Sequence, residues 1–371
     1  MERIKVLFYI DSLGRGGAET QAVDVCRNAG RFGIDITFVT ARGGPLESAV
    51  AESGVEFIKL DRRLPLDLYL ASQIRRIIKE RGIRIVHGYQ AVEGVHLYMA
   101  TRGLKDVKRV LSFQGFVADR KNRFSLKYLI PRMHANLSVS QGLRKWLSEY
   151  DGLDTQTNFS VHFNGADPER LKPSGRSIRS ELGFDEDSLL FGMVANFYVD
   201  PRKDQLTICR ALPEVFEELP KAQFVFAGGI EPGAEDKMAD CLNVCIENGI
   251  ADRVHFLGSR ADIPDILAAL DVFVFSSLQE GLPVAVTEAM LAGVPLIVSD
   301  IGPLLETTAN GDYGRIFPVG DRKKLAELMI ELGSDDKERH ALCERAKMFA
   351  DENFSIDAHL RELRKIYLSV L

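Results

Sequence analysis

The chain has 371 residues, too many for one compact hydrophobic core and about right for two α/β domains of ordinary size. Hydrophobic residues make up 46% of the chain and charged residues 27%, which excludes a disordered or collagen-like protein. The net charge of −6 argues against a dedicated nucleic-acid binder, although residues 1–167 carry a charge of +7 and the remainder carries −13.

Three features of the sequence indicate where the protein is located. No apolar run approaches the roughly 20 residues that span a bilayer, and Val6–Ile10 is typical of a short buried strand rather than of a signal peptide. The five cysteines are odd in number and scattered, which favours packing roles in a reducing compartment. We therefore expect a cytoplasmic protein, and the basic first half, which attracts anionic lipid head groups, suggests the inner face of the cytoplasmic membrane.

Short apolar runs rich in β-branched residues recur through the first half and predict buried strands. They lie at residues 4–10, 35–40, 55–60, 84–88, 109–113 and 136–140. Helical patterns fall between them, among them Ala18–Ala29, Leu68–Arg81 and Val92–Arg102. This alternation predicts a parallel sheet of Rossmann type.

The second half repeats the alternation. Its predicted strands lie at residues 189–196, 222–229, 253–258, 271–277 and 295–300. Between the halves, at residues 164–174, Asn164-Gly165 and two prolines interrupt any periodic pattern and mark a hinge. We predict a Rossmann-like domain at residues 1–167, a second one at 168–354, and a C-terminal helix at 355–371 that crosses back to the first domain. Two such domains leave a central cleft between the carboxyl edges of their sheets, where these folds bind ligands.

The loop after the first predicted strand contains Gly14, Gly16 and Gly17 and leads directly into a helix. Backbone N–H groups at such a turn suit a phosphate or a sugar, although a tight turn without a ligand explains the glycines equally well. A dinucleotide fingerprint requires a glycine in place of Glu19 and an acidic residue in place of Thr40. The sequence therefore argues against a nicotinamide-dependent enzyme.

The most informative segment is EGLPVAVTEAM, residues 280–290, which follows a predicted strand directly. Pro283 suits the first position of a helix and Gly293 its C-terminal stop, so the helix N-terminus would offer N–H groups to a diphosphate. Glu280 precedes this helix and Glu288 lies more than one turn inside it. Carboxylates beside an anion are favourable when they accept hydrogen bonds from hydroxyls, and a nucleotide sugar supplies both groups.

Two glutamates eight positions apart in this segment, with the earlier GGAE and the later AGVPLIVSDIGPLLE, resemble the signature of retaining GT-B glycosyltransferases of family 4. The resemblance spans nearly the whole chain and implies the GT-B fold, an α/β fold with two Rossmann-like, doubly wound domains that face a central cleft. It implies that the N-terminal domain binds the acceptor and the C-terminal domain the nucleotide sugar. It also implies that Glu280 contacts hydroxyls of the donor sugar and that Glu288 binds the ribose. The residues expected at the donor are Gly16, Gly17, Gly258, Gly281, Leu282, Pro283 and Glu288.

A basic pair, Arg202 and Lys203, follows the predicted strand at 189–196 and opens another helix. Both side chains are placed to neutralise a leaving diphosphate, and the family uses a lysine at this point for that purpose. Many relatives also place an arginine at the end of the preceding strand, where this chain has Asn196, so we expect Arg202 to supply the second charge. With Glu280, Lys203 and Arg202 form the expected catalytic set.

Two further positions concern the nucleobase and the acceptor. The loop at residues 256–260, which contains Gly258, resembles the family's base-binding loop. After the strand at 109–113, where relatives often have a histidine, this chain has Gln114, and glutamine cannot exchange a proton near neutral pH. We expect Gln114 to bind the acceptor or the sugar without acting as a base. His87, at the end of the strand at 84–88, is a second candidate there, with a packed core histidine as the alternative.

The segment Arg120–Ile130 mixes cationic and apolar side chains within the basic half. It predicts either a peripheral membrane patch or an ordinary amphipathic helix with a solvated basic face, with equal weight. A lipid-linked acceptor would favour the membrane interpretation.

Together these observations predict a retaining glycosyltransferase that moves a hexose-type sugar from a nucleotide diphosphate sugar to a glycan or lipid-linked acceptor, with a UDP-sugar favoured. Displacement at the anomeric carbon passes through an oxocarbenium-like transition state, and Lys203, Arg202 and the helix beginning near Pro283 would stabilise the charge on the diphosphate. The resemblance implies chemistry without a metal or another cofactor. The alternatives are a sugar-nucleotide epimerase, a phosphorylase on the same fold, and a catalytically inactive nucleotide-sugar-binding protein.

Overall fold

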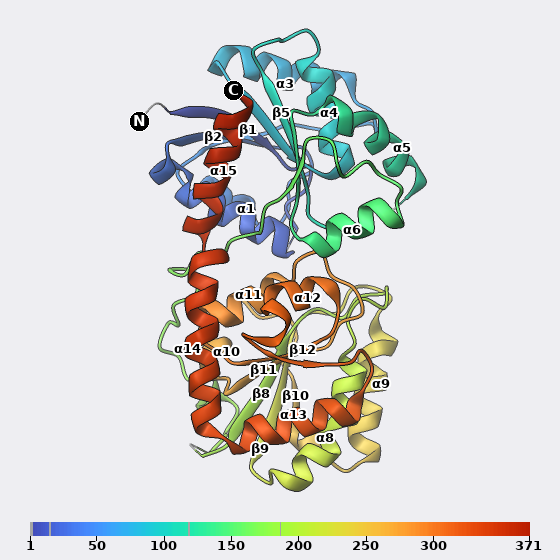
Figure 1. Cartoon of the computed structure of the whole chain (residues 1–371), viewed down its shortest axis with the longest axis vertical. Coiled ribbons are helices and arrows are strands. Elements are labelled where there is room, and N and C mark those ends of the chain that lie inside the picture. Colours follow the sequence, from blue (N-terminus) through green and yellow to red (C-terminus); the bar gives the residue numbers. More distant parts are fainter. Residues whose placement is uncertain (1–2, 15, 118, 186) are drawn as a thin grey trace. The chain divides into compact units, whose positions relative to one another are not determined.

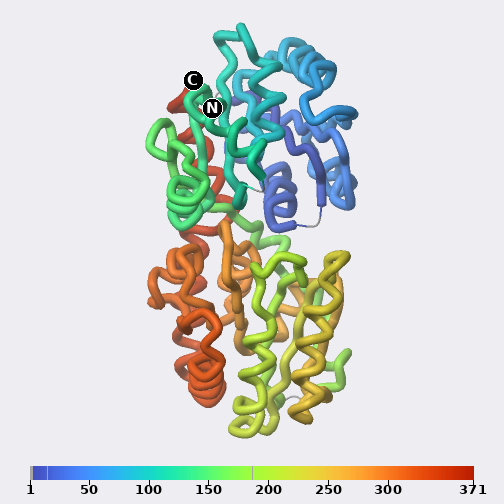
Figure 2. The backbone as a smooth tube through the Cα atoms, turned by 90° about the vertical axis from the view of Figure 1, so that its right-hand side faces the viewer, coloured from blue at the N-terminus to red at the C-terminus, as the bar shows by residue number. Residues whose placement is uncertain are grey.

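The computed structural model describes residues 3–14, 16–117, 119–185 and 187–371 (Figure 1). The chain forms two compact units. Unit 1 runs to Ala166 and also includes Ile356–Leu371, and unit 2 is Asp167–Ser355. The backbone colours in Figure 2 show that each unit is continuous in sequence apart from the red C-terminal helix, which belongs to unit 1.

Unit 1 is built on a parallel sheet of seven strands in the order β3-β2-β1-β4-β5-β6-β7. The strands are β1 (Ile4–Tyr9), β2 (Ile34–Thr40), β3 (Glu56–Lys59), β4 (Ile85–Tyr89), β5 (Lys108–Phe113), β6 (Ala135–Ser138) and β7 (Phe159–Val161). The first six were predicted. The strand β7 was missed by the sequence prediction.

Helices cover both faces of the unit 1 sheet. They are α1 (Gly17–Asn28), α2 (Glu47–Ala51), α3 (Leu68–Arg81), α4 (Gln90–Thr101), α5 (Arg120–Leu129), α6 (Gln141–Glu149) and α15 (Ile356–Val370), with the 3₁₀ turns η1 (Ala29–Phe32) and η2 (Ile130–Arg132). Successive residues of β1 point to opposite faces. Val6 and Phe8 join a core with α1 and α15, whereas Leu7 and Tyr9 join a second core with α3 and α4.

Unit 2 has a parallel sheet of six strands in the order β10-β9-β8-β11-β12-β13. The strands are β8 (Leu189–Val194), β9 (Ala222–Ala227), β10 (Val254–Phe256), β11 (Val272–Phe275), β12 (Leu296–Ser299) and β13 (Arg315–Phe317). Here too one strand of three residues, β13, was missed by the sequence prediction. The two parallel sheets confirm the predicted α/β class with two Rossmann-like units.

The helices of unit 2 complete the alternation. They are α7 (Ile178–Glu181), α8 (Gln205–Glu218), α9 (Glu235–Glu247), α10 (Ile263–Ala269), α11 (Val284–Leu291), α12 (Gly302–Thr307), α13 (Arg322–Ser334) and α14 (Asp336–Asn353), with the 3₁₀ turns η3 (Ala251–Arg253) and η4 (Ala309–Gly311). Within the residues described in either unit, no helix is long and apolar enough to cross a bilayer.

Candidate functional site

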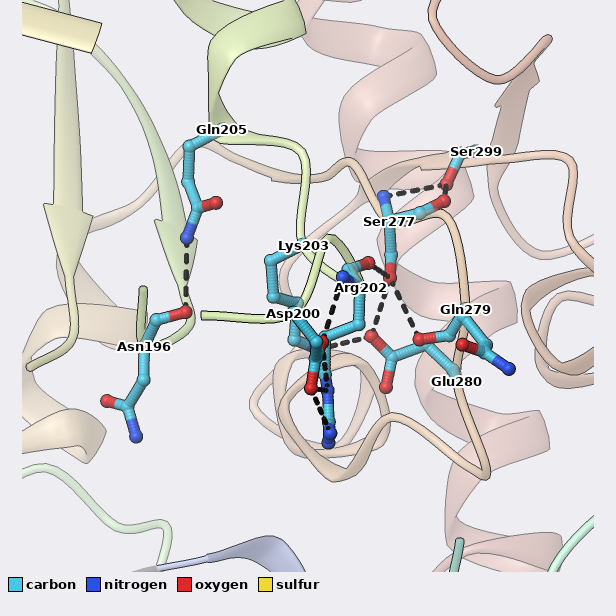
Figure 3. A network of polar contacts seen from close by, with 9 residues as sticks. All are labelled: Asn196, Asp200, Arg202, Lys203, Gln205, Ser277, Gln279, Glu280 and Ser299. Carbon is cyan, nitrogen blue, oxygen red and sulfur yellow. Dashed lines mark hydrogen bonds and ion pairs between the residues drawn. The ribbon is translucent and has the colours of Figure 1, made fainter. Parts of the chain in front are cut away.

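Two loops of unit 2 meet where the strand order of the sheet reverses, between β8 and β11. Ligands bind at such switch points, beyond the carboxyl ends of the strands. Backbone contacts join the two loops: Lys203 forms a bridge with Ser277, and the N–H of Leu278 donates to the carbonyl oxygen of Arg202 at 2.8 Å. The motif around Lys203 and the motif around Glu280 are therefore brought together (Figure 3).

An ion pair between Lys203 and Glu280 lies inside this junction, with the lysine Nζ donating to Glu280 Oε1. The two side chains are only 11% and 10% exposed, so each charge depends on the other for compensation. The lysine Nζ also lies 4.3 Å from the centre of the Phe275 ring, and the Ser277 Oγ lies 2.7 Å from Glu280 Oε1. Ser277 is itself fixed, because its N–H donates to the Ser299 Oγ at 3.0 Å.

Arg202 is held differently from its neighbour Lys203. Its Nε donates to the Asp200 carboxylate at 2.7 and 2.9 Å (Figure 3). Its guanidinium also lies 4.9 Å from the centre of the Tyr198 ring. The hydrogen bonds with Asp200 raise the pKa of Arg202. Both cations are therefore paired with a carboxylate, Arg202 in a half-exposed pair with Asp200 and Lys203 in a buried pair with Glu280 at the switch point.

Glu288 lies on α11 and is buried, with 7% of its surface exposed. Its Oε1 accepts a 2.6 Å hydrogen bond from the Nη2 of Arg170, a residue that the sequence analysis did not single out. The N-terminus of α11 departs slightly from expectation, because Pro283 is the residue before the first helical turn and the helix begins at Val284. Gly293 follows the helix with a φ of +77°, which confirms it as the C-terminal stop.

The expected base-binding loop lies beside the ends of β8 and β9. Gly258 has a φ of +65°, and its carbonyl oxygen accepts from the N–H of Gly228 at 2.9 Å. Asn196 lies just beyond β8, and its Oδ1 accepts from the N–H of Gly229 at 2.8 Å. The side chain of Asn196 thus joins the loop after β8 to the loop after β9.

In unit 1, the predicted glycine loop leads into α1. Gly16 is the residue before the helix and Gly17 is its first residue. The Glu19 side chain folds back over this turn, since a Cβ on Gly16 would lie 2.4 Å from Glu19 Oε2. Burial raises the pKa of Glu19. A larger residue at position 16 would therefore have to displace this carboxylate.

His87 and Gln114 lie in different surroundings. His87 is buried, its Nδ1 lies 2.7 Å from the Tyr367 hydroxyl and its Nε2 lies 2.7 Å from the Ser112 Oγ. Burial lowers the pKa of His87 to about 3. Gln114 is half-buried just beyond β5, and its Oε1 accepts from the Asn164 Nδ2 at 2.7 Å. Both ring nitrogens of His87 are thus occupied within the core, and only Gln114 stands at the carboxyl edge of the sheet.

The carboxyl edge of the unit 1 sheet also carries a charged cluster that the sequence analysis missed. Asp11, just after β1, accepts from the Arg62 Nε at 2.7 Å and from its Nη2 at 2.8 Å. The N–H of Asp11 donates to Glu93 Oε1 at 3.0 Å, and burial raises the pKa of Glu93 to about 8. The position of Asp11 directly after a predicted strand was the one available signal, because Arg62 and Glu93 are far away in sequence.

Both halves of the chain match known glycosyltransferase families. Residues 15–170 match the family described as Glycosyltransferase Family 4, and residues 175–349 match the Glycosyl transferases group 1 family. The chain is 26% identical over 355 residues to UDP-Gal:alpha-D-GlcNAc-diphosphoundecaprenol alpha-1,3-galactosyltransferase of Escherichia coli, covering 91% of this chain and 90% of the relative. It is 30% identical over 298 residues to the lipopolysaccharide core biosynthesis mannosyltransferase LpsB of Rhizobium meliloti, covering 78% and 81%.

Solved structures show the same fold over the whole chain. A glycosyltransferase from Rickettsia africae has a TM-score of 0.86 at 17% identity, covering 100% of this chain and 99% of the other. Anabaena HepE in complex with UDP and glucose has a TM-score of 0.84 at 20% identity, covering 100% of both chains.

Fold and site together define a GT-B glycosyltransferase, an enzyme that transfers a sugar from a nucleotide sugar. The chain belongs to glycosyltransferase family 4, the glycosyl transferases of group 1.

Proposed function

We propose that the protein is a retaining, metal-independent hexosyltransferase that uses a UDP-sugar and a lipid-linked or glycan acceptor. The observation that carries this proposal is the Lys203–Glu280 ion pair at the switch point of unit 2, directly before the N-terminus of α11. A cation suits a diphosphate, and a carboxylate suits the hydroxyls of a sugar. A nucleotide sugar is the ligand that presents these two groups side by side.

Unit 2 is the proposed donor-binding domain. We assign the ribose to Glu288, the base to backbone groups around Gly258, and the diphosphate to Lys203 and to the N–H groups at the start of α11, near Gly281 and Leu282. Pro283 fixes the entry to this helix without needing a hydrogen-bond acceptor. Glu280 would accept a hydrogen bond from a hydroxyl of the sugar.

The ion pair gives a physical account of how binding and catalysis are coupled. When the donor enters, the Lys203 Nζ exchanges Glu280 for a diphosphate oxygen, and Glu280 exchanges the lysine for a sugar hydroxyl. As the bond at the anomeric carbon breaks, negative charge grows on the diphosphate, so the contribution of Lys203 is largest in the transition state. Arg202 adds charge to the extent that it is released from Asp200.

Retention is supported by the family and by the side chains at the edge of unit 1, the proposed acceptor domain. A diphosphate oxygen can take the proton of the acceptor hydroxyl, so the reaction does not need a side-chain base. Gln114 fits this scheme because a carboxamide orients a hydroxyl without exchanging its proton. Gly16 and Gly17 remain assigned to the donor, whereas His87 is left out of the proposed site because its ring nitrogens are occupied in the core.

Donor and acceptor are proposed from the names of the relatives. The Escherichia coli relative is a galactosyltransferase named for UDP-Gal and for a diphosphoundecaprenol acceptor, and the HepE structure contains UDP and glucose.

A membrane-embedded acceptor would require peripheral contact with the inner face of the cytoplasmic membrane. Unit 1 offers apolar side chains for it, with Phe124 on α5 being 78% exposed among cations. A second exposed apolar group precedes and opens α3, at Leu64, Leu66, Leu68 and Tyr69.

The reaction itself tests the proposal. The purified chain is incubated with UDP-hexoses, with and without a short-chain lipid diphosphate acceptor and with EDTA, and the anomeric configuration of the product is determined by NMR. We expect acceptor-dependent, EDTA-insensitive transfer with retention, and its loss in Glu280→Gln. An epimerised donor without acceptor, a phosphate-dependent sugar phosphate, or donor binding without turnover would each replace the proposal by one of the alternatives.

A further inference from the structure

A shallow polar pocket lies in unit 1 at the amino ends of β5 and β6, the opposite edge of the sheet from Gln114. Its volume is about 520 Å³. Its polar lining consists of Tyr98, Arg109, Arg132, His134, Asn158 and Ser369. The donor and acceptor sites proposed above use none of these residues.

Two arginines of this pocket are stacked on aromatic rings rather than paired with carboxylates. The Arg132 guanidinium lies 3.8 Å from the centre of the Tyr128 ring, and the Arg109 guanidinium lies 5.7 Å from that of Tyr98. The Arg109 Nε donates to the carbonyl oxygen of Arg132 at 3.0 Å, and the Arg132 Nη1 donates to that of Tyr128 at 2.7 Å. In the part of the chain that the structure describes, neither arginine forms an ion pair, so most of their N–H donors remain available.

The surroundings of these arginines are positively charged. Burial, together with Arg109 and Lys108, lowers the pKa of His134, and burial alone lowers that of Arg109. The His134 Nδ1 accepts from the backbone N–H of Arg109 at 3.0 Å, which leaves Nε2 as the protonated ring nitrogen and a further donor. A half-buried cation without a counter-ion is costly, and an anion in the pocket would remove that cost.

We propose that this pocket binds a phosphate ester. Guanidinium groups present a planar fork of donors that matches phosphate oxygens, and the Tyr98 hydroxyl and the Asn158 amide of the lining supply further neutral donors. The phosphate can belong to a soluble metabolite or to the head group of an anionic phospholipid, because both present the same oxygens. The second source fits the location of the pocket, since Tyr128 also lies on the exposed face of α5.

The primary test is a titration of the 371-residue protein with inorganic phosphate and with glycerol 3-phosphate. The imidazole NMR signal of His134 reports binding. We expect a saturable shift, and an affinity at least about tenfold weaker in Arg109→Gln and in Arg132→Gln. Arg76→Gln on α3 is the matched control, because it removes an exposed arginine of the same unit and should leave the affinity unchanged. No saturable shift, or equal affinity in all the proteins, would overturn the proposal.

Sedimentation with vesicles distinguishes the two sources of phosphate. Binding to phosphatidylglycerol vesicles but not to phosphatidylcholine vesicles, weakened in Arg132→Gln, assigns the pocket to a phospholipid. Phosphate binding that the arginine variants weaken while vesicle binding stays unchanged assigns it to a soluble ester. Arg132 is exposed, so its variant decides the test if Arg109→Gln fails to fold. Sugar transfer to a short-chain acceptor should stay within about twofold of wild type in all variants, which separates this proposal from the catalytic one.

Discussion

Replacing Lys203 by methionine should lower the stability of unit 2 as well as its activity. The substitution leaves the Glu280 carboxylate, 10% exposed, without its cation. Breaking a buried pair from one side costs about 3–5 kcal/mol, and the remaining hydrogen bond from the Ser277 Oγ offsets part of that cost. We expect a net loss of about 3 kcal/mol in the free energy of unfolding. In the double variant Lys203→Met/Glu280→Gln, which removes both charges, about 1 kcal/mol or less should be lost.

Urea unfolding separates this effect from a general loss of structure. The single tryptophan, Trp146, lies in unit 1, so its fluorescence follows unit 1 while far-UV circular dichroism follows both units. The Lys203→Met variant should shift the circular dichroism transition to lower urea, and the double variant should restore it. If the double variant is no more stable than the single one, the two charges do not compensate each other as described.

Activity measurements on Lys203→Met and Arg202→Met compare the catalytic roles proposed for the two cations. Lys203→Met removes the cation that we propose acts mainly in the transition state, so it should reduce kcat by about 100- to 1000-fold. Arg202→Met should cost about tenfold, because the Arg202 and Asp200 side chains are each 46% exposed and solvent screens their charges. A larger loss for Arg202→Met than for Lys203→Met would contradict the assigned roles.

Three further predictions concern ligand affinity, backbone packing and the pH dependence of stability. Glu288→Ala should weaken UDP binding about 10- to 100-fold, because it removes the carboxylate that we propose accepts hydrogen bonds from the ribose hydroxyls, and calorimetry would show unchanged affinity if Glu288 does not bind the ribose. Gly228→Ala should destabilise unit 2 by about 3 kcal/mol, because its Cβ would lie 2.0 Å from the Ala195 carbonyl oxygen, and an unchanged melting temperature would refute this clash. Burial lowers the pKa of His87 to about 3 and also lowers the pKa values of His162 and His359. The folded protein therefore keeps these rings neutral, while the unfolded chain takes up protons below about pH 6.5. Stability should therefore fall as the pH drops from about 6.5 towards 3, and a melting temperature that is constant between pH 7.5 and pH 5 would argue against it.

Local sequence patterns predicted most of the fold and both motifs of the proposed donor site. The longer strands and the helix after EGLPV were predictable because hydrophobic periodicity, Pro283 and Gly293 are local signals. The three-residue strands β7 and β13 were missed, whereas β10, which is equally short, was predicted as part of the longer run at residues 253–258.

The pairing of side chains was not predictable from sequence. Arg170 binds Glu288 across 118 positions, and Asp11 binds Arg62 across 51, so only the folded chain brings them together. For His87, the strand end suggested a ligand-facing residue, but Tyr367 from the C-terminal helix contacts its ring, and no local pattern reports that contact.

A thermal-shift panel with UDP, GDP, ADP, their common sugars and NAD, each with and without EDTA, tests the central claim most directly. A ligand at 100 times its dissociation constant should add about 2.7 kcal/mol of stability. The account predicts an EDTA-insensitive shift with uridine nucleotides that is lost in Glu288→Ala and in Lys203→Ala, each compared with its own ligand-free melting temperature. A shift with NAD alone, or a UDP shift that both variants retain, would contradict the proposed donor site.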